Sequence, residues 1–160
     1  MASEQPAFVE EAIDRFKRHF PKGRDVTLII LKGHLLVEEQ LNALLATAFA
    51  KPEALAKARL SFPQRICLLS AAYPHISSHE LLALEHLNSL RNLLAHRLEH
   101  PDLAKAICKF LDALWPGSPP RPWQSKKPYS LPELKNSVAL LAGTLVGIRR
   151  GILGARGVAT

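Results

Sequence analysis

The chain has 160 residues, of which 48% are hydrophobic and 22% are charged. This length suits one domain with a short tail and excludes two domains of ordinary size. The composition is typical of a globular protein and excludes an intrinsically disordered one. The formal net charge of +7 suggests a polyanionic partner, although a total does not say where on the molecule the charge lies.

Apolar residues recur every three to four positions along nearly the whole chain, whereas the two-residue alternation of a strand is not found. Residues 26–31 have strand propensity, but the helical period continues to Leu45, which favours one long buried helix. The pattern predicts helices over residues 5–20, 25–49, 63–72, 79–98 and 102–115, with a short helix or turn over 52–60.

The composition of the chain changes after residue 115, where prolines become frequent. Six prolines between residues 116 and 132 predict an extended linker of the polyproline type. A last helix is predicted from Leu131 to Arg150, followed by a frayed end. The sequence therefore predicts an all-α fold, in which residues 1–115 form an up-and-down bundle of four to five helices, residues 116–132 a linker, and residues 133–160 an appended basic helix and tail.

Two helix starts carry the pattern of a capping box, in which a Ser side chain and a Glu side chain three residues later each bond the other's backbone amide. These pairs are Ser77 with Glu80 and Ser130 with Glu133. Pro132 lies in the first turn of the last helix, where its missing N–H does no harm.

The positive charge lies mostly in the C-terminal part. Residues 1–115 hold 14 basic and 13 acidic residues, whereas residues 116–160 hold seven basic residues and one acidic residue. We therefore expect a nearly neutral bundle joined to a strongly basic tail.

We expect neither a signal peptide nor a membrane-spanning segment in this sequence. Its N-terminus is polar, and its longest apolar run, Val138–Ile148, has 11 residues and is too short to span a membrane. Cys67 and Cys108 lie in apolar helical stretches, where we expect buried free thiols, although a bridge between them stays open. We expect a cytoplasmic protein without a membrane partner.

The segment around residues 90–97 holds Arg91, Asn92 directly after it, and His96 five residues after the arginine. Chance would give about 0.5 Arg-x4-His pairs in this composition, but only about 0.01 with the added Asn. Asn92 and His96 share a helix face, so the amide can orient the imidazole. Arg91 lies about 140° from His96 around the helix, so these two converge only at a distorted helix end or across a symmetric dimer.

These side chains suit cleavage of RNA without a metal. A histidine such as His96 can take the proton of a 2′-hydroxyl or supply one to the leaving oxygen. An arginine such as Arg91 can stabilise the charge that develops on the phosphate. The alternative is a structural role, in which both side chains tie the end of their helix to its neighbours.

At these residues the chain resembles the HEPN superfamily (higher eukaryotes and prokaryotes nucleotide-binding). Its catalytic members carry Arg-x4–6-His, commonly with Asn, Asp or His after the Arg, near a helix end in an all-α bundle. The resemblance covers about residues 5–115. It implies a homodimer with facing motifs and a metal-independent endoribonuclease that needs no cofactor. Arg91, Asn92 and His96 would be its catalytic residues, and RNA its substrate.

Many such proteins act in toxin–antitoxin, abortive-infection or CRISPR systems, so the resemblance also implies a possible antitoxin partner. Toxins paired with a nucleotidyltransferase antitoxin extend the motif to His-x-Tyr. Leu98 occupies that tyrosine position here, which departs from that subfamily.

A second resemblance is carried by three segments: 34–42, with His34, Glu38, Glu39 and Asn42; 62–66, with Phe62 and Arg65; and the Arg91 motif. Their order resembles the mannitol operon repressor family. Its members are all-α transcriptional regulators rather than nucleases, so the motif would be architectural.

Other residues have both a functional and a structural interpretation. Aromatic and basic side chains are interleaved at Arg121, Trp123, Lys126 and Lys127, which suits binding of single-stranded nucleic acid. The alternative is a structural role, in which this proline-rich segment packs its aromatic side chains on the bundle. Glu38 and Glu39 either support the site or, as we favour, form a salt bridge to Arg65 or Lys32.

Two further spacings have weaker interpretations. The His pairs 75/79 and 96/100 have a spacing that zinc can use, but nearby breaks in the helices argue against it. The Gly-x3-Gly spacings at residues 143, 147 and 151 permit close helix packing.

Overall fold

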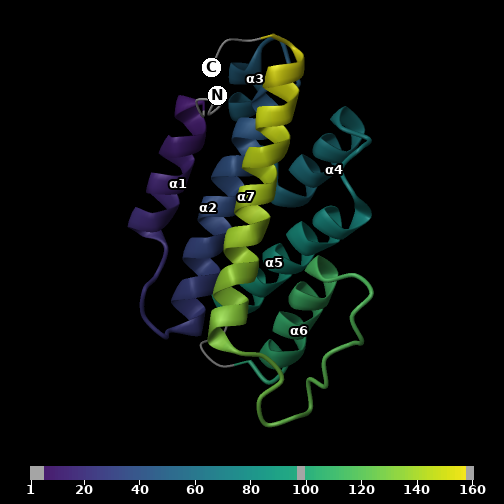
Figure 1. Cartoon of the computed structure of the whole chain (residues 1–160). Helices are drawn as coiled ribbons and strands as arrows, with labels where there is room; N and C mark the ends of the chain where they lie inside the picture. The colour runs from purple at the N-terminus through teal and green to yellow at the C-terminus, as the bar shows by residue number, and fades with distance from the viewer. Residues whose placement is uncertain (1–5, 97–99, 158–160) are drawn as a thin grey trace.

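A computed structural model describes residues 6–96 and 100–157, with the side chain of His96 excepted (Figure 1). The described residues form helices and no strands, which confirms the predicted all-α fold. The helices are α1 (Ala7–His19), α2 (Val26–Ala46), α3 (Pro52–Lys57), α4 (Phe62–Ala72), α5 (Ser78–His96), α6 (Leu103–Leu114) and α7 (Leu131–Ala155).

Helix α2 is the centre of the bundle. It contacts α1, α3, α4, α5 and α7, and α6 packs mainly on α5. Figure 1 shows α2 and α7 side by side and running in the same direction, with α1 along the outside of the pair. Helices α4 and α5 lie on the other side of α2, so α5 is held between α2 and α6.

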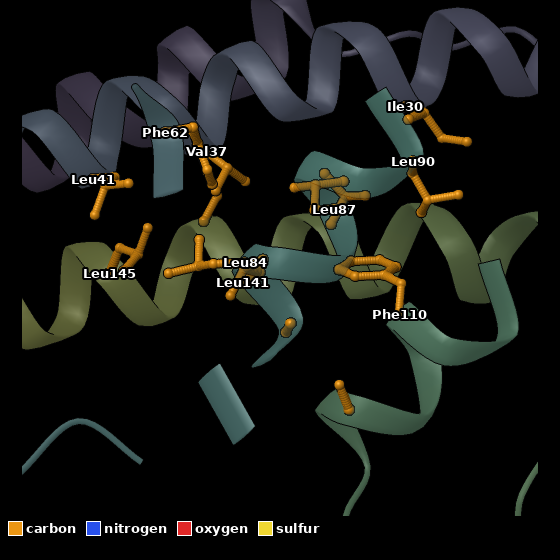
Figure 2. Close-up of a cluster of buried hydrophobic side chains, with 14 of the residues drawn as sticks. Ile30, Val37, Leu41, Phe62, Leu84, Leu87, Leu90, Phe110, Leu141 and Leu145 are labelled. Carbon is orange, nitrogen blue, oxygen red and sulfur yellow. The ribbon is translucent and has the colours of Figure 1, made fainter. Parts of the chain in front are cut away.

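The core is one continuous apolar cluster to which α2, α4, α5, α6 and α7 contribute (Figure 2). Its fully buried side chains include Ile30, Val37, Leu41, Leu84, Leu87, Leu90, Phe110, Leu141 and Leu145. Burial of a large apolar side chain contributes about 1.5–3 kcal/mol, so this cluster dominates the stability of the fold.

Both predicted capping boxes are present. The Ser77 amide donates to the Glu80 carboxylate at 2.9 Å and the Glu80 amide to Ser77 Oγ at 3.4 Å. The equivalent bonds between Ser130 and Glu133 measure 3.4 and 3.2 Å. A third box joins Ser61 and Gln64, in which the side-chain amide oxygen of Gln64 takes the place of a carboxylate oxygen.

Helix α7 is part of the core rather than an appendage to it. Leu134, Val138, Leu141 and Leu145 are fully buried against the rest of the bundle. The helix also continues five residues beyond the predicted end at Arg150. Ile152 packs against the core, and the guanidinium of Arg156 donates to the backbone carbonyl of Thr47 at the end of α2. These contacts hold a glycine-containing segment that would fray in isolation.

The segment between α6 and α7 holds turns and bends at residues 115–118, 123–126 and 128–129, whereas residues 119–122 carry no assigned turn. Arg121 organises it, because its guanidinium pairs with both Asp112 of α6 and Glu133 of α7. Backbone bonds from Trp123 to Arg121 and from Ser125 to Pro122 tighten the turn. We call residues 115–130 the strap; Figure 1 shows it beside α6.

The two cysteines are both free thiols, as expected, but only Cys108 is buried. Cys67 lies on the exposed side of α4, which corrects the expectation for that residue. The nearby carbonyl of Pro128 lies 3.9 Å from the Cys108 sulfur.

By length and composition alone, α7 is long and apolar enough to cross a membrane. A helix in the core of a bundle meets the same criteria, and α7 supplies several core residues. The criterion therefore does not assign this helix to a membrane.

The close approach of α2 and α7 depends on Gly33. A Cβ at this position would lie 2.7 Å from Val138 Cγ1 and 3.4 Å from the Phe20 ring. Valine has one preferred side-chain rotamer in a helix, so Val138 cannot easily turn away. The helices must separate to accept any side chain at residue 33.

We expect Gly33→Ala to lower the free energy of unfolding by about 1–2 kcal/mol, because overpacking outweighs the better helix propensity of alanine. Gly143→Ala is the matched control, since nothing lies within 4 Å of its Cβ, and it should raise stability by up to about 1 kcal/mol. Urea denaturation followed by circular dichroism measures both. Equal stability of the two variants would contradict the importance of this contact.

Candidate functional site

The predicted site lies on the last turns of α5. Arg91 and Asn92 are both exposed, and the Arg91 guanidinium donates to the Asn92 side-chain oxygen at 3.1 Å. His96 is the last residue of α5, one helical turn after Asn92. Its side chain and residues 97–99 lie outside the described part of the chain. The structure therefore places Arg91 and Asn92 together on the surface, on the helix that ends at His96.

A polar cluster lies under this surface, between α2, α4 and α5. Glu38 of α2 forms an ion pair with Arg65 of α4, as the sequence predicted. The Glu38 carboxylate also lies 3.8 Å from Nδ1 of His34, one turn earlier on α2. Asn88 of α5 lies beside the imidazole, which stacks on Phe62 with ring centroids 4.5 Å apart. These residues link three helices near the Arg91 side of α5.

His34 is almost fully buried, with 4% of its surface exposed. Its Nε2 atom has no hydrogen-bond partner among the described residues. Burial lowers the pKa of His34, and the charge of Glu38 and the Asn88 side chain oppose that shift only in part. The positive charge of Arg91 lowers the pKa further. A neutral imidazole is thus the form that this site stabilises.

The second acidic residue of α2 has a different partner from the one expected. Glu39 binds Arg15 of α1 in a bidentate ion pair, with distances of 2.6 and 2.7 Å, rather than Arg65 or Lys32. The Arg15 guanidinium lowers the pKa of the Glu39 carboxyl. Sequence could not find this pair because it depends on how α1 crosses α2. Glu39 therefore ties the outer helix to the bundle and does not contact Arg91.

The four proposed RNA contacts of the strap have different environments. Trp123, Lys126 and Lys127 are exposed. Arg121 has its charge matched by Asp112 and Glu133, and its side chain is only 16% exposed. A residue so paired organises the strap, and we do not retain it as an RNA contact.

No cluster of three His, Cys, Asp or Glu side chains that could hold a metal occurs within residues 6–95 and 100–157. His75 and His79 are exposed near the start of α5. The partner of His100 in the other predicted pair, His96, has no described side chain.

A pocket that contains Lys105 and Lys109 lies between α5 and α6, and the sequence pattern alone did not predict it. The signal was present, because lysines four residues apart share one side of a helix. The pocket itself forms only where α5 and α6 pack together, and the residue spacing within one helix does not predict that packing.

The chain matches no protein-family model, no curated protein and no solved structure at a significant level. The interpretation of the site therefore rests on its residues and geometry.

We expect the stability of the protein to fall as the pH is lowered from about 7.5 to about 5. The pKa of His34 is lowered in the folded state, so the unfolded chain binds the proton more readily below the ordinary histidine pKa of about 6.5. His86 contributes in the same direction, because burial lowers its pKa too.

Urea denaturation across this pH range should give a shallower pH dependence for His34→Leu than for the wild type. His86→Leu should remove the other part of the slope. A pH dependence unchanged by His34→Leu would show that this imidazole does not stay neutral in the fold.

Proposed function

We propose that the chain is a metal-independent endoribonuclease of the HEPN type that acts as a homodimer. The observation that carries the proposal is the exposed, hydrogen-bonded pair of Arg91 and Asn92 on the helix that ends at His96. A structural arginine would be expected in an ion pair with a neighbouring element. Among the described residues, Arg91 instead bonds the adjacent Asn92 and faces solvent.

These groups account for each charge in the reaction. The 2′-oxygen of a ribose attacks the adjacent phosphorus, the bond to the 5′-oxygen of the next nucleotide breaks, and a 2′,3′-cyclic phosphate and a 5′-hydroxyl form. His96 accepts the 2′-hydroxyl proton or supplies one to the leaving oxygen. Arg91 neutralises the additional negative charge on the phosphoryl oxygens, and Asn92 orients the groups beside it.

A homodimer would supply the second histidine that such an exchange of protons uses. Leu28 and Leu35 support a protein partner, because they lie on one side of α2 and are 40% and 58% exposed. An exposed leucine pair on the central helix favours an interface on that side of α2. RNA as substrate implies action in the cytoplasm, with an antitoxin as a further partner if the enzyme is a toxin.

One observation favours a non-catalytic regulator like the mannitol operon repressor family. His34, Glu38 and Arg65 carry that resemblance, and they meet in one polar cluster. Joined in this way they stabilise the packing of α2, α4 and α5, which is an architectural role. Arg91 would then extend the same cluster rather than act on RNA.

Cleavage of RNA separates the two functions. The wild type should cleave a mixed RNA substrate in EDTA, and His96→Ala and Arg91→Ala should each lower the rate by at least about 100-fold, since general acid–base catalysis contributes about 100- to 10,000-fold. A substrate with deoxyribose at the cleaved nucleotides should resist, because it lacks the attacking hydroxyl. Gel analysis of end-labelled RNA measures the rates.

Arg18→Ala is the matched control, since it removes an exposed arginine from α1, far from α5 in the sequence, and should leave the rate unchanged. Circular dichroism establishes that all variants fold. Absence of cleavage by the folded wild type would favour the regulator. Cleavage that persists in both site variants would assign the activity to other residues.

Leu35→Glu should convert the dimer into a monomer, because it places a charge on an apolar interface, and should lower the cleavage rate at least about tenfold. Leu82→Glu is the control, since Leu82 is an exposed leucine on α5 with a 41% exposed side chain. Sedimentation velocity gives the oligomeric state. A Leu35→Glu variant that stays dimeric would place the interface elsewhere.

A further inference from the structure

A polar pocket of about 410 Å³ lies between α5 and α6, on a different side of α5 from Arg91. This volume is sufficient for a small polar ligand. The residues that line it are His86, Ser89, Leu93, Asp102, Lys105, Ala106 and Lys109. The proposed cleavage reaction does not use any of these side chains.

The chemistry of the pocket favours a phosphate. Lys105 and Lys109 both line the pocket and lie four residues apart, so their side chains share one side of α6. His86 adds a hydrogen-bond donor from α5, whereas Ser89 Oγ donates to the Glu85 carbonyl at 2.9 Å and serves the pocket as an acceptor. Burial and then the charge of Lys109 lower the pKa of His86, which favours a neutral ring that can donate one hydrogen bond. Two cations and a neutral donor in one concavity are groups that bind phosphoryl oxygens.

An exposed aromatic ring contacts one of the two lysines that line this pocket. The ammonium of Lys105 lies 5.1 Å from the centroid of the Trp123 ring, and the Trp123 side chain is 40% exposed. This contact joins the strap to α6. An indole beside a cationic pocket can stack on a nucleic-acid base while the lysines hold the phosphate.

Asp102 is the one carboxylate among the described residues that line the pocket. It would repel a phosphate, but it can accept hydrogen bonds from ribose hydroxyls. Its carboxylate lies 4.0 Å from His100 Nδ1, beside the start of α6. The pocket and the neighbouring Trp123 ring together therefore offer groups for a phosphate, a ribose and a base, which are the three parts of a ribonucleotide.

We propose that this pocket binds one nucleotide of a single-stranded RNA, with its phosphate on Lys105 and Lys109 and its base on Trp123. As an RNA subsite of the enzyme, it rests on the proposed function. Ser89 of the pocket lies three residues before Asn92, so the two positions are one turn apart and about 60° apart around α5. A strand bound in the pocket can thus continue around α5 to Arg91 and Asn92.

Binding is tested with the full chain carrying His96→Ala, so that the RNA stays intact. Fluorescence anisotropy with a labelled RNA of about 12 nucleotides gives the Kd. Adding Lys105→Gln with Lys109→Gln should raise the Kd at least about tenfold and make its salt dependence shallower, because two phosphate contacts are lost. Trp123→Ala should also raise the Kd by about tenfold, whereas Trp123→Phe should keep it within about threefold.

Lys17→Gln with Arg18→Gln is the matched control, because it removes two exposed positive charges from α1. It should change the Kd by less than about twofold if the pocket, rather than the total charge, binds RNA. A DNA strand of the same sequence should bind more weakly than the RNA, and Asp102→Asn should reduce that difference.

Pocket variants that bind RNA as tightly as the α1 control would overturn the proposal. Equal binding of RNA and DNA would overturn the ribose contact. Because binding is measured without cleavage, the result is separate from the proposed activity. If the wild type does not cleave RNA but its RNA binding depends on Lys105, Lys109 and Trp123, the nucleotide site stands and the nuclease activity does not. If the wild type cleaves RNA and these three residues do not affect binding, the nuclease activity stands and this site does not.

Discussion

The packing of α2 against α7 is the constraint on which the rest of the molecule depends. The two helices are far apart in sequence and run in parallel, with Gly33 against Val138 at their contact. They are also joined near both ends, where Lys135 donates to the carbonyl of Lys22 and Arg156 to that of Thr47. Because α2 is fixed in this way, α5 has a fixed surface to pack on. The positions of Arg91 and Asn92 follow from that packing.

The helices could be predicted because their signals are local. Apolar spacing and the pairs Ser77–Glu80 and Ser130–Glu133 placed most helix ends within a few residues of those observed. The strap and the last turns of α7 could not be predicted in the same way. Their conformations depend on Arg121 and Arg156, whose partners lie on other elements. Proline content and glycine content describe what an isolated segment prefers, and here tertiary contacts override that preference.

For the candidate site, the sequence could predict which residues share α5 but not what surrounds them. Glu38 with Arg65 was predictable as a charge in an apolar stretch that needs a partner. The environment of His34, whose Nε2 has no hydrogen-bond partner among the described residues, was not predictable. The basic tail shows the same limit. Several of its cations make contacts within the fold, since Arg121 pairs with two acids and Arg149 lies over the Phe8 ring at 4.3 Å. The net charge of a segment therefore overstates the charge that it offers to a ligand.

The ion pairs of Arg121 also lower the conformational-entropy cost of binding a ligand at the strap. Glu133 accepts from Arg121 with one carboxylate oxygen and from the Ser130 amide with the other. The start of α7 and the turn of the strap are therefore ordered together when the bundle folds. Trp123 lies two residues after Arg121, and its backbone amide bonds the Arg121 carbonyl, so this junction fixes its position. The loop around Trp123 is thus already ordered once the protein has folded. A ligand that binds the Trp123 ring does not have to order this loop, so that part of the entropy cost of binding is not incurred on association.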